Sequence, residues 1–368
     1  MPTDPMLMRA RRERAAMAAG RAGIGALLIS PGSDLTYLSG HRIHASERFT
    51  CLVLTADGAA TLVVPELEAP RAHTNAPGVE VRTWGETDDP VALVAAIAPR
   101  AGTLAVDDRM WSTFVLGLEA ALSGRRFVTS SAVIADLRAR KDDGEIAALR
   151  TVARGADRAF AALRERTLGG RPEREISAEI GELLRAEGHV EVGFAIVASG
   201  PNGASPHHLS ADRVVSAGDA LVLDFGGVQD WYCSDITRTV HVGASVDPEI
   251  RRVHDVVLRA QEAGYRAARE GVEAAAVDAA ARAVIADAGY GDRFIHRLGH
   301  GIGLDGHEHP YLVRGNAQRL EPGMAFSIEP GVYIPGRFGV RIEDIAYVDA
   351  HGVAQPLNEA DRSLAIVR

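Results

Sequence analysis

Acidic residues interrupt apolar, strand-like segments at two places in the second half of this chain. The first is Ala220–Gly227, an apolar run that carries Asp224, followed after a short connection by Asp235 and the strand-like segment 236–242. The midpoint between the two acids falls in the connection, so a symmetric hairpin would place them directly opposite each other. Opposed side chains in an antiparallel pair lie about 5 Å apart, where two like charges are destabilising.

The same arrangement recurs downstream. A strand-like segment at 324–334 carries Glu329, and a second at 339–349 carries Glu343. Their midpoint is Gly336, which directly follows a proline and favours a turn. We therefore expect Glu329 and Glu343 also to face each other across a hairpin.

Four carboxylates in two opposed pairs need compensating positive charge. Buried carboxylates without partners are costly and tend to become protonated. Two divalent cations would balance the four negative charges, and we favour them over solvated or salt-bridged acids. Hard oxygen ligands favour Mn²⁺, while neighbouring imidazoles leave Co²⁺, Zn²⁺ or Fe²⁺ open. The histidine-rich stretch 296–309 and the pair His207-His208 could supply those imidazoles.

The length of the chain predicts two domains, because a single core rarely extends beyond roughly 250–300 residues. The chain has 368 residues, and we place the boundary after residue 138. Residues 1–138 alternate predicted strands and helices, including a hairpin around Asp57-Gly58, and indicate a small α/β domain. Residues 139–368 combine long helices with several strands, which indicates an α+β domain.

The composition excludes several classes of protein. Hydrophobic residues make up 46% and charged residues 24%, which are ordinary globular values, and no apolar run reaches the ~18 residues of a membrane helix. The net charge of −9 argues against sequence-independent nucleic-acid binding, which needs a basic surface. The two cysteines, Cys51 and Cys233, cannot form a disulfide framework, so we expect a cytoplasmic protein.

Five short motifs carry a resemblance to a known family. The chain resembles the pita-bread (creatinase/prolidase-like) metallopeptidases of the Xaa-Pro dipeptidase and Xaa-Pro aminopeptidase kind. The resemblance implies a C-terminal pita-bread catalytic domain after a smaller N-terminal α/β creatinase-like domain. The motifs are Leu-Asp224-Phe-Gly, Ser-Asp235-Ile-Thr-Arg-Thr, Gly-His300-Gly-Ile-Gly, Ile-Glu329-Pro-Gly and Arg-Ile-Glu343-Asp.

The resemblance also implies roles for individual residues. Two metal ions would be held by Asp224, Asp235, His300, Glu329 and Glu343. The histidines implied to contact the substrate carbonyl and its developing oxyanion are His207, His296 and His307. Glu329 would also move the proton from water to the leaving nitrogen, and Arg341 would orient the ligand carboxylates from the same strand as Glu343.

The implied activity is hydrolysis of the peptide bond that precedes proline, with X-Pro dipeptides as the expected substrates and a homodimer as the expected assembly. Three alternatives stay open: an Xaa-Pro aminopeptidase acting on longer peptides, a non-peptide amidohydrolase such as creatinase, and a non-catalytic binding module. The last two typically lack the metal ligands, whereas all five are present here.

Two further residues are candidates for substrate binding. Tyr333 occupies a position near the site in relatives. Some proline dipeptidases carry an arginine four residues after the position of His307, but this chain has Tyr311 there. Arg314 is the nearest arginine in the sequence, and its planar guanidinium could bind the carboxylate of a dipeptide through two N–H donors.

Overall fold

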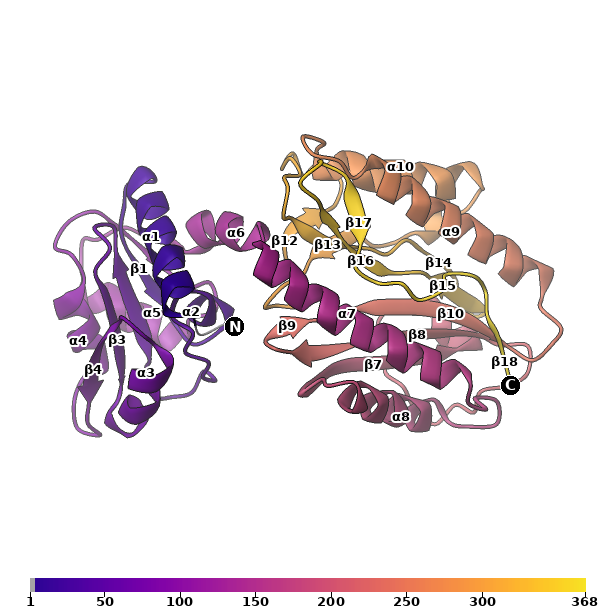
Figure 1. The fold of residues 1–368 in the computed structure, drawn as a ribbon, viewed down its shortest axis with the longest axis horizontal. Coiled ribbons are helices and arrows are strands. Elements are labelled where there is room, and N and C mark those ends of the chain that lie inside the picture. The colour runs from indigo at the N-terminus through magenta and orange to yellow at the C-terminus, as the bar shows by residue number, and fades with distance from the viewer. Residues whose placement is uncertain (1–3) are drawn as a thin grey trace. The chain divides into compact units, whose positions relative to one another are not determined.

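The computed structural model describes residues 4–368 and divides the chain into two compact units, one ending at Arg138 and one running from Ala139 to Arg368. Each unit has its own apolar core and combines helices with sheet (Figure 1). The predicted fold class, an α/β unit followed by an α+β unit, is confirmed. No helix within residues 4–368 is both long and apolar enough to cross a membrane.

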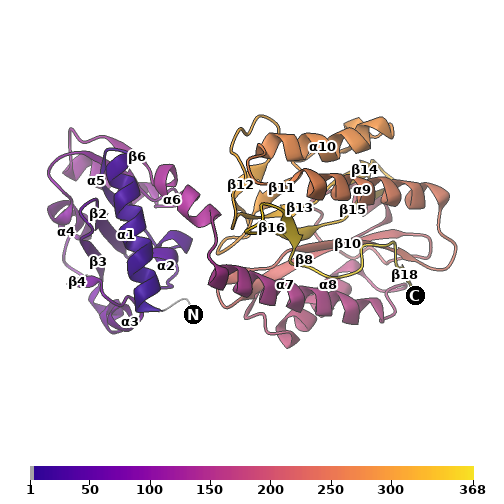
Figure 2. The ribbon, with the colours of Figure 1, turned by 45° about the horizontal axis from the view of Figure 1, so that its top comes forward.

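The first unit is built on a six-stranded mixed sheet in the order β4-β3-β2-β1-β5-β6, with helices packed around it (Figure 2). The predicted hairpin at Asp57-Gly58 is confirmed, because β2 and β3 pair antiparallel on either side of it. The strands are β1 Ile24–Ile29, β2 Cys51–Thr55, β3 Ala60–Pro65, β4 Glu80–Trp84, β5 Thr103–Val106 and β6 Phe127–Thr129. The helices are α1 Pro5–Arg21, α2 Ser33–Ser39, η1 Glu66–Glu68, α3 Ala69–Asn75, α4 Pro90–Ile97, α5 Ser112–Ala121 and α6 Ser131–Ala139.

The second unit contains three sheets. The first has the order β18-β10-β8-β7 with β9 paired to β8, the second has the order β12-β11-β13-β16-β17, and the third is the pair β14-β15. The strands of the first sheet are β7 Glu191–Ser199, β8 Ala220–Gln229, β9 Tyr232–Cys233, β10 Ile236–Val242 and β18 Ile366–Val367. The remaining strands are β11 Gly299–Gly301, β12 Glu308–Leu312, β13 Ala325–Ile328, β14 Gly331–Ile334, β15 Phe338–Arg341, β16 Asp344–Val348 and β17 Ala354–Pro356.

Helices of the second unit lie on two outer faces, with α7 and α8 on one side and α9 and α10 on the other in both views (Figures 1 and 2). A capping box begins α7, since Asp142 accepts from the Glu145 backbone and Glu145 accepts in return. Its buried positions recur every three or four residues and pack toward the first sheet. The helices are α7 Asp143–Arg164, α8 Glu173–Ala186, η2 Gly200–Ala204, α9 Pro248–Ala267, α10 Ala274–Asp287 and η3 Gly291–Arg293.

The predicted direct opposition of Asp224 and Asp235 is wrong. In the structure Asp224 pairs with Thr237, two residues beyond Asp235. The reason is the turn: β8 and β9 close at Asp230-Trp231, whose φ angles of 49° and 77° belong to a tight two-residue connection. The midpoint therefore lies one residue later than symmetry predicted. A two-residue offset keeps both carboxylates on the same face of the sheet.

The second hairpin has the predicted register. β13 pairs with β16 and β14 with β15 in one continuous alignment, so Glu329 and Glu343 occupy facing positions between the two pairs. The expected strands are interrupted there. Pro330, after Glu329, has no N–H for a ladder, and the backbone N–H of Glu343 donates to Thr237 of the first sheet instead. The two acids thus lie where the sheets meet.

A close backbone contact in the second unit provides a test of this packing. A side chain at Gly339 in β15 would overlap the carbonyl oxygen of Gly203 in η2, so Gly339→Ala must push the two backbones apart. We expect the substitution to lower the free energy of unfolding by about 1–3 kcal/mol, measured by urea denaturation. Gly181→Ala in α8 is the matched control, because its Cβ would make only ordinary contacts. Equal stability of the two variants would contradict this packing.

Candidate metal centre

A cleft of about 590 Å³ lies in the second unit. It brings together all the predicted site residues except Arg314 and Tyr333. Four acids, four histidines and two arginines surround it, next to three apolar residues. The lining residues are Phe194, Ile196, Pro206, His207, Asp224, Asp235, His296, Arg297, His300, His307, Glu329, Arg341 and Glu343.

Four carboxylates and one imidazole meet at this cleft from both main sheets. His300 Nε2, on β11, lies 3.3 Å from Glu329 Oε1, 3.7 Å from Asp235 Oδ2 and 3.9 Å from Glu343 Oε1. Oxygens of Asp224, Asp235 and Glu343 form a second group, whose possible ligand atoms all lie within 4.8 Å of one another. Asp235 and Glu343 belong both to this second group and to the acids near His300, so the five residues form one continuous cluster.

Two carboxylate oxygens of this cluster lack the partners that burial demands. Asp235 Oδ1 and Glu343 Oε1 are buried and have no hydrogen-bond partner. Burial, and after it the neighbouring carboxylates, raise the pKa values of Asp235 and Glu343 well above their usual range, and burial raises the pKa of Glu329 to about 7. Cations among these oxygens would satisfy the unpaired atoms and offset the repulsion, so the donor set fits divalent metal ions.

The ring of His300 is oriented so that Nε2 faces the carboxylates. Its Nδ1 donates to the Gly301 carbonyl at 3.1 Å, which leaves a lone pair on Nε2. Burial, followed by the charge of nearby His307, lowers the pKa of His300 to about 3, so the imidazole is neutral. Ser327 ties this residue to an acid: its hydroxyl accepts from the His300 backbone and donates to Glu329 Oε1 at 3.1 Å.

Thr237 and Arg341 hold the acids from behind. The Thr237 hydroxyl donates to Glu343 Oε2 at 2.6 Å and accepts from Arg341 Nε at 3.1 Å. Arg341 also forms an ion pair with Asp224. One threonine and one arginine therefore connect acids from both hairpins, which suits Arg341 to orient the carboxylates.

Tyr333 does not line the cleft but lies directly behind it. Its hydroxyl accepts from Arg341 Nη1 at 2.8 Å and lies 2.9 Å from His296 Nε2. His296 Nδ1 donates to the Arg297 carbonyl at 2.7 Å, so Nε2 must accept from the tyrosine. Burial, and then the charge of Arg341, lower the pKa of His296 to about 4. Both ring nitrogens of His296 are thus engaged within the protein.

His207 and its neighbour His208 have different surroundings. His207 is exposed and borders the cleft, whereas His208 Nε2 donates to Glu173 Oε2 at 2.8 Å. The buried Glu173 carboxylate, at the start of α8, also accepts from the backbone and hydroxyl of Ser199 and from the amide of Asn202. Glu173 therefore fixes both sides of the segment that presents His207 to the cleft.

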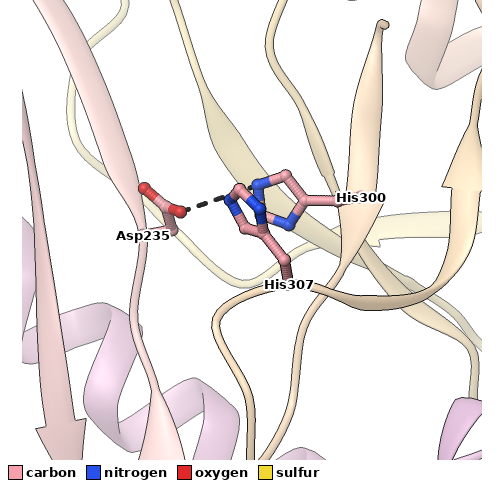
Figure 3. Close-up of side chains that lie close together, drawn as sticks. All are labelled: Asp235, His300 and His307. Atoms are coloured by element: carbon pink, nitrogen blue, oxygen red, sulfur yellow. Dashed lines mark ion pairs between the residues drawn. The ribbon is translucent and has the colours of Figure 1, made fainter. Parts of the chain in front are cut away.

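His307 lies beside His300, with ring centroids 3.8 Å apart (Figure 3). Arg297 Nη2 donates to its Nδ1 at 3.2 Å. Burial, followed by the charge of Arg297, lowers the pKa of His307, so the neutral ring carries its proton on Nε2. That N–H is a donor available to an oxygen in the cleft.

One predicted site residue lies away from the cleft, and two residues that were not predicted contact the site. Arg314 is exposed after β12 and does not line the cleft. Thr237 and Arg297 were not predicted. Thr237 could have been found from its place two residues after Asp235, on the same strand face. No pattern distinguishes Arg297 from a surface arginine, because its contact with His307 depends on how the intervening loop folds.

Two family models match most of the chain. Residues 147–350 match metallopeptidase family M24, and residues 11–140 match the creatinase/prolidase N-terminal domain. The second match covers the first compact unit, and the first covers every residue of the carboxylate cluster.

Relatives of similar length support this assignment. A protein of Mycobacterium tuberculosis named "Probable dipeptidase PepE" is 46% identical over 358 residues, which cover 96% of this chain and 95% of the relative. An Xaa-Pro dipeptidase of Pyrococcus horikoshii is 33% identical over 342 residues, covering 93% and 94%. The crystal structure of dipeptidase PepE from Mycobacterium ulcerans superposes with a TM-score of 0.94 at 43% identity and covers 99% of each chain. The chain therefore belongs to metallopeptidase family M24 and carries a creatinase/prolidase N-terminal domain.

Proposed function

We propose that this protein is a dinuclear-metal exopeptidase that hydrolyses the peptide bond preceding proline in X-Pro dipeptides. The observation that carries the proposal is the cluster of buried carboxylates around His300, two of whose oxygens lack partners, at the floor of an open cleft. The relatives named Xaa-Pro dipeptidase support the choice of substrate.

Five residues would hold the two cations: Asp224, Asp235, His300, Glu329 and Glu343. Their oxygen-rich donor set favours Mn²⁺, with Co²⁺, Zn²⁺ and Fe²⁺ as alternatives. When bound, such a pair of cations lowers the pKa of a water molecule and polarises the scissile carbonyl. Asp235 and Glu343 each belong to two of the three groups of candidate ligand atoms, which supports placing both among the residues that would hold the cations.

Proton transfer is assigned to Glu329. Its carboxylate is partly exposed at the cleft, so it can reach both a bound water molecule and the departing nitrogen of a substrate held there. Ser327 donates to Oε1 and so holds the carboxylate in place. Glu329 would carry a proton from water to the departing proline nitrogen.

The histidines at the cleft would bind the substrate oxygen. His307 presents its Nε2–H, and His207 borders the cleft on a separate segment. His296 would serve as a fixed part of the wall, because its ring nitrogens are engaged by Tyr333 and Arg297. The apolar residues Phe194, Ile196 and Pro206 offer a surface for the proline ring.

The cellular setting is part of the same proposal. Both cysteines are free, and burial raises the pKa values of both thiols, that of Cys233 to about 12, which disfavours the thiolate form. Free cysteines are consistent with a reducing cytoplasm. A homodimer is proposed on the family resemblance.

A substrate series tests the activity and its alternatives. An X-Pro dipeptide, an X-Pro tripeptide and a longer X-Pro peptide are compared with Mn²⁺, Co²⁺ or Zn²⁺ supplied to chelated protein. We expect metal-dependent release of the first residue, with the dipeptide giving the highest kcat/KM. Higher kcat/KM for longer peptides would identify an Xaa-Pro aminopeptidase, whereas metal binding without hydrolysis of any peptide would favour a binding module or an amidohydrolase.

The raised pKa values predict a pH dependence of stability in the metal-free protein. Asp235, Glu329 and Glu343 retain protons in the folded state that the unfolded chain has lost, so the free energy of unfolding falls as pH rises through their folded pKa values. Histidines with lowered pKa values act in the opposite direction near pH 6.5, because the imidazoles of the unfolded chain are still partly protonated there and lose that proton only about one pH unit higher. We therefore compare the metal-free parent with Glu343→Gln, which has the same histidines, and expect the parent to lose stability relative to the variant as pH rises, by up to ~1.4 kcal/mol per pH unit for this one group.

This dependence is measured by urea denaturation at several pH values with and without Mn²⁺. Bound metal should raise stability most at the higher pH, since protons and cations compete for the same oxygens. The same pH dependence for the metal-free parent and Glu343→Gln, or a stability that Mn²⁺ does not change, would contradict the proposed site.

Substitution of the proposed proton carrier gives a sharper test. Glu329→Gln preserves the shape of the side chain but removes its ability to accept a proton, so we expect kcat to fall by about 10²–10⁴ with the fold intact. The control is Glu321→Gln, which changes an exposed acid outside the cleft. Both are assayed in excess Mn²⁺. A near-normal kcat for Glu329→Gln would remove Glu329 from this role.

A further inference from the structure

Arg297 is a cation that borders the cleft, and its charge favours the ionised form of Glu329. Among the residues that the structure describes, it forms no ion pair with a carboxylate, although it borders the cleft. The other arginine of the cleft, Arg341, is paired with Asp224. Arg282, which hydrogen-bonds to the backbone next to Arg297, is paired with Asp278 through two nitrogens.

The Arg297 guanidinium is held in place by two contacts that leave its charge available. It lies over the ring of Tyr311, 4.5 Å from the centroid, and Nη2 donates to His307 Nδ1 at 3.2 Å. A guanidinium has five N–H donors in a planar fork, which matches a carboxylate. One donor is used by His307, so others can serve a ligand in the cleft.

We propose that Arg297 binds the terminal carboxylate of a dipeptide substrate and thereby sets the preferred peptide length. This inference rests on the proposed peptidase function and adds a determinant of its specificity. His307, offered above as a donor to the oxygen of the scissile carbonyl, is in direct contact with Arg297. In a dipeptide the terminal carboxylate follows one residue after that carbonyl, and successive Cα atoms are about 3.8 Å apart. A guanidinium beside His307 is therefore within one residue of the bond to be cleaved.

The charge balance of the cleft with two cations bound also favours a substrate carboxylate beside Arg297. Two divalent cations would neutralise the four acids, and Arg341 is already paired. Arg297 would then supply the positive charge that a substrate carboxylate needs, whereas an amide or a longer chain at the same place would leave it unpaired. Arg314, the substitute considered from the sequence, is exposed and lies outside the lining of the cleft.

The experiment compares a dipeptide acid with its amide on the Mn²⁺-loaded enzyme, using Ala-Pro and Ala-Pro-amide. The parent should favour the acid by about tenfold or more in kcat/KM, as expected for charge-assisted hydrogen bonds. Arg297→Met should lower kcat/KM for the acid about 10–100-fold more than for the amide, mainly through KM, because the loss of the contact with His307 affects both substrates alike whereas the loss of the carboxylate contact affects only the acid. Arg297→Lys keeps the positive charge but lacks the planar guanidinium, so it should retain part of the preference for the acid over the amide.

Arg293→Met is the matched control, because Arg293 is exposed, lies four residues earlier and is outside the cleft. Equal losses on acid and amide in Arg297→Met would overturn the inference and make Arg297 a positioning residue for His307. Loss of the acid preference in Arg314→Met instead would assign the role to Arg314. An active parent that does not discriminate acid from amide would overturn the inference alone, whereas a parent that hydrolyses neither would overturn the proposed function with it.

Discussion

Repulsion among four closely spaced carboxylates is the constraint on which the second unit depends. At a separation of about 5 Å, two such charges repel by roughly 3 kcal/mol even at an effective dielectric constant of 20. Arg341 offsets one of them directly through Asp224, and two oxygens of the cluster have no partner. A chain that only needed to fold would replace these acids with apolar residues. In our proposal divalent cations supply the missing positive charge, and their binding offsets the electrostatic repulsion among the carboxylates.

The surrounding structure keeps the cluster open on one side and rigid on the others. Thr237 links the two sheets, because its carbonyl accepts from the Glu343 backbone while its hydroxyl donates to the Glu343 carboxylate. Ser327 couples His300 to Glu329 in the same manner. These neutral hydroxyls fix the acids without neutralising them, so the charge remains available to a metal. The histidines of the cleft lie on separate segments, which Glu173 and Arg297 hold in position.

The sequence predicted the chemistry of the site better than its geometry. Acids within apolar strands identified both hairpins, and the register between Glu329 and Glu343 followed from a symmetric turn. The same reasoning misaligned Asp224 and Asp235, because the tight turn at Asp230-Trp231 shifts the pairing. Contacts through loops were beyond prediction. The link from Tyr333 to both His296 and Arg341, and that from Arg297 to His307, join segments whose approach depends on the tertiary fold.

The proposal that two metal ions occupy the carboxylate cluster is tested most directly by anomalous scattering from crystals of the protein loaded with Mn²⁺. We expect two anomalous peaks in the cleft, next to the carboxylates of Asp224, Asp235, Glu329 and Glu343 and to His300. A single peak would reduce the site to one metal. An absence of peaks at these carboxylates, in crystals of protein that hydrolyses an X-Pro dipeptide, would contradict the proposed dinuclear centre.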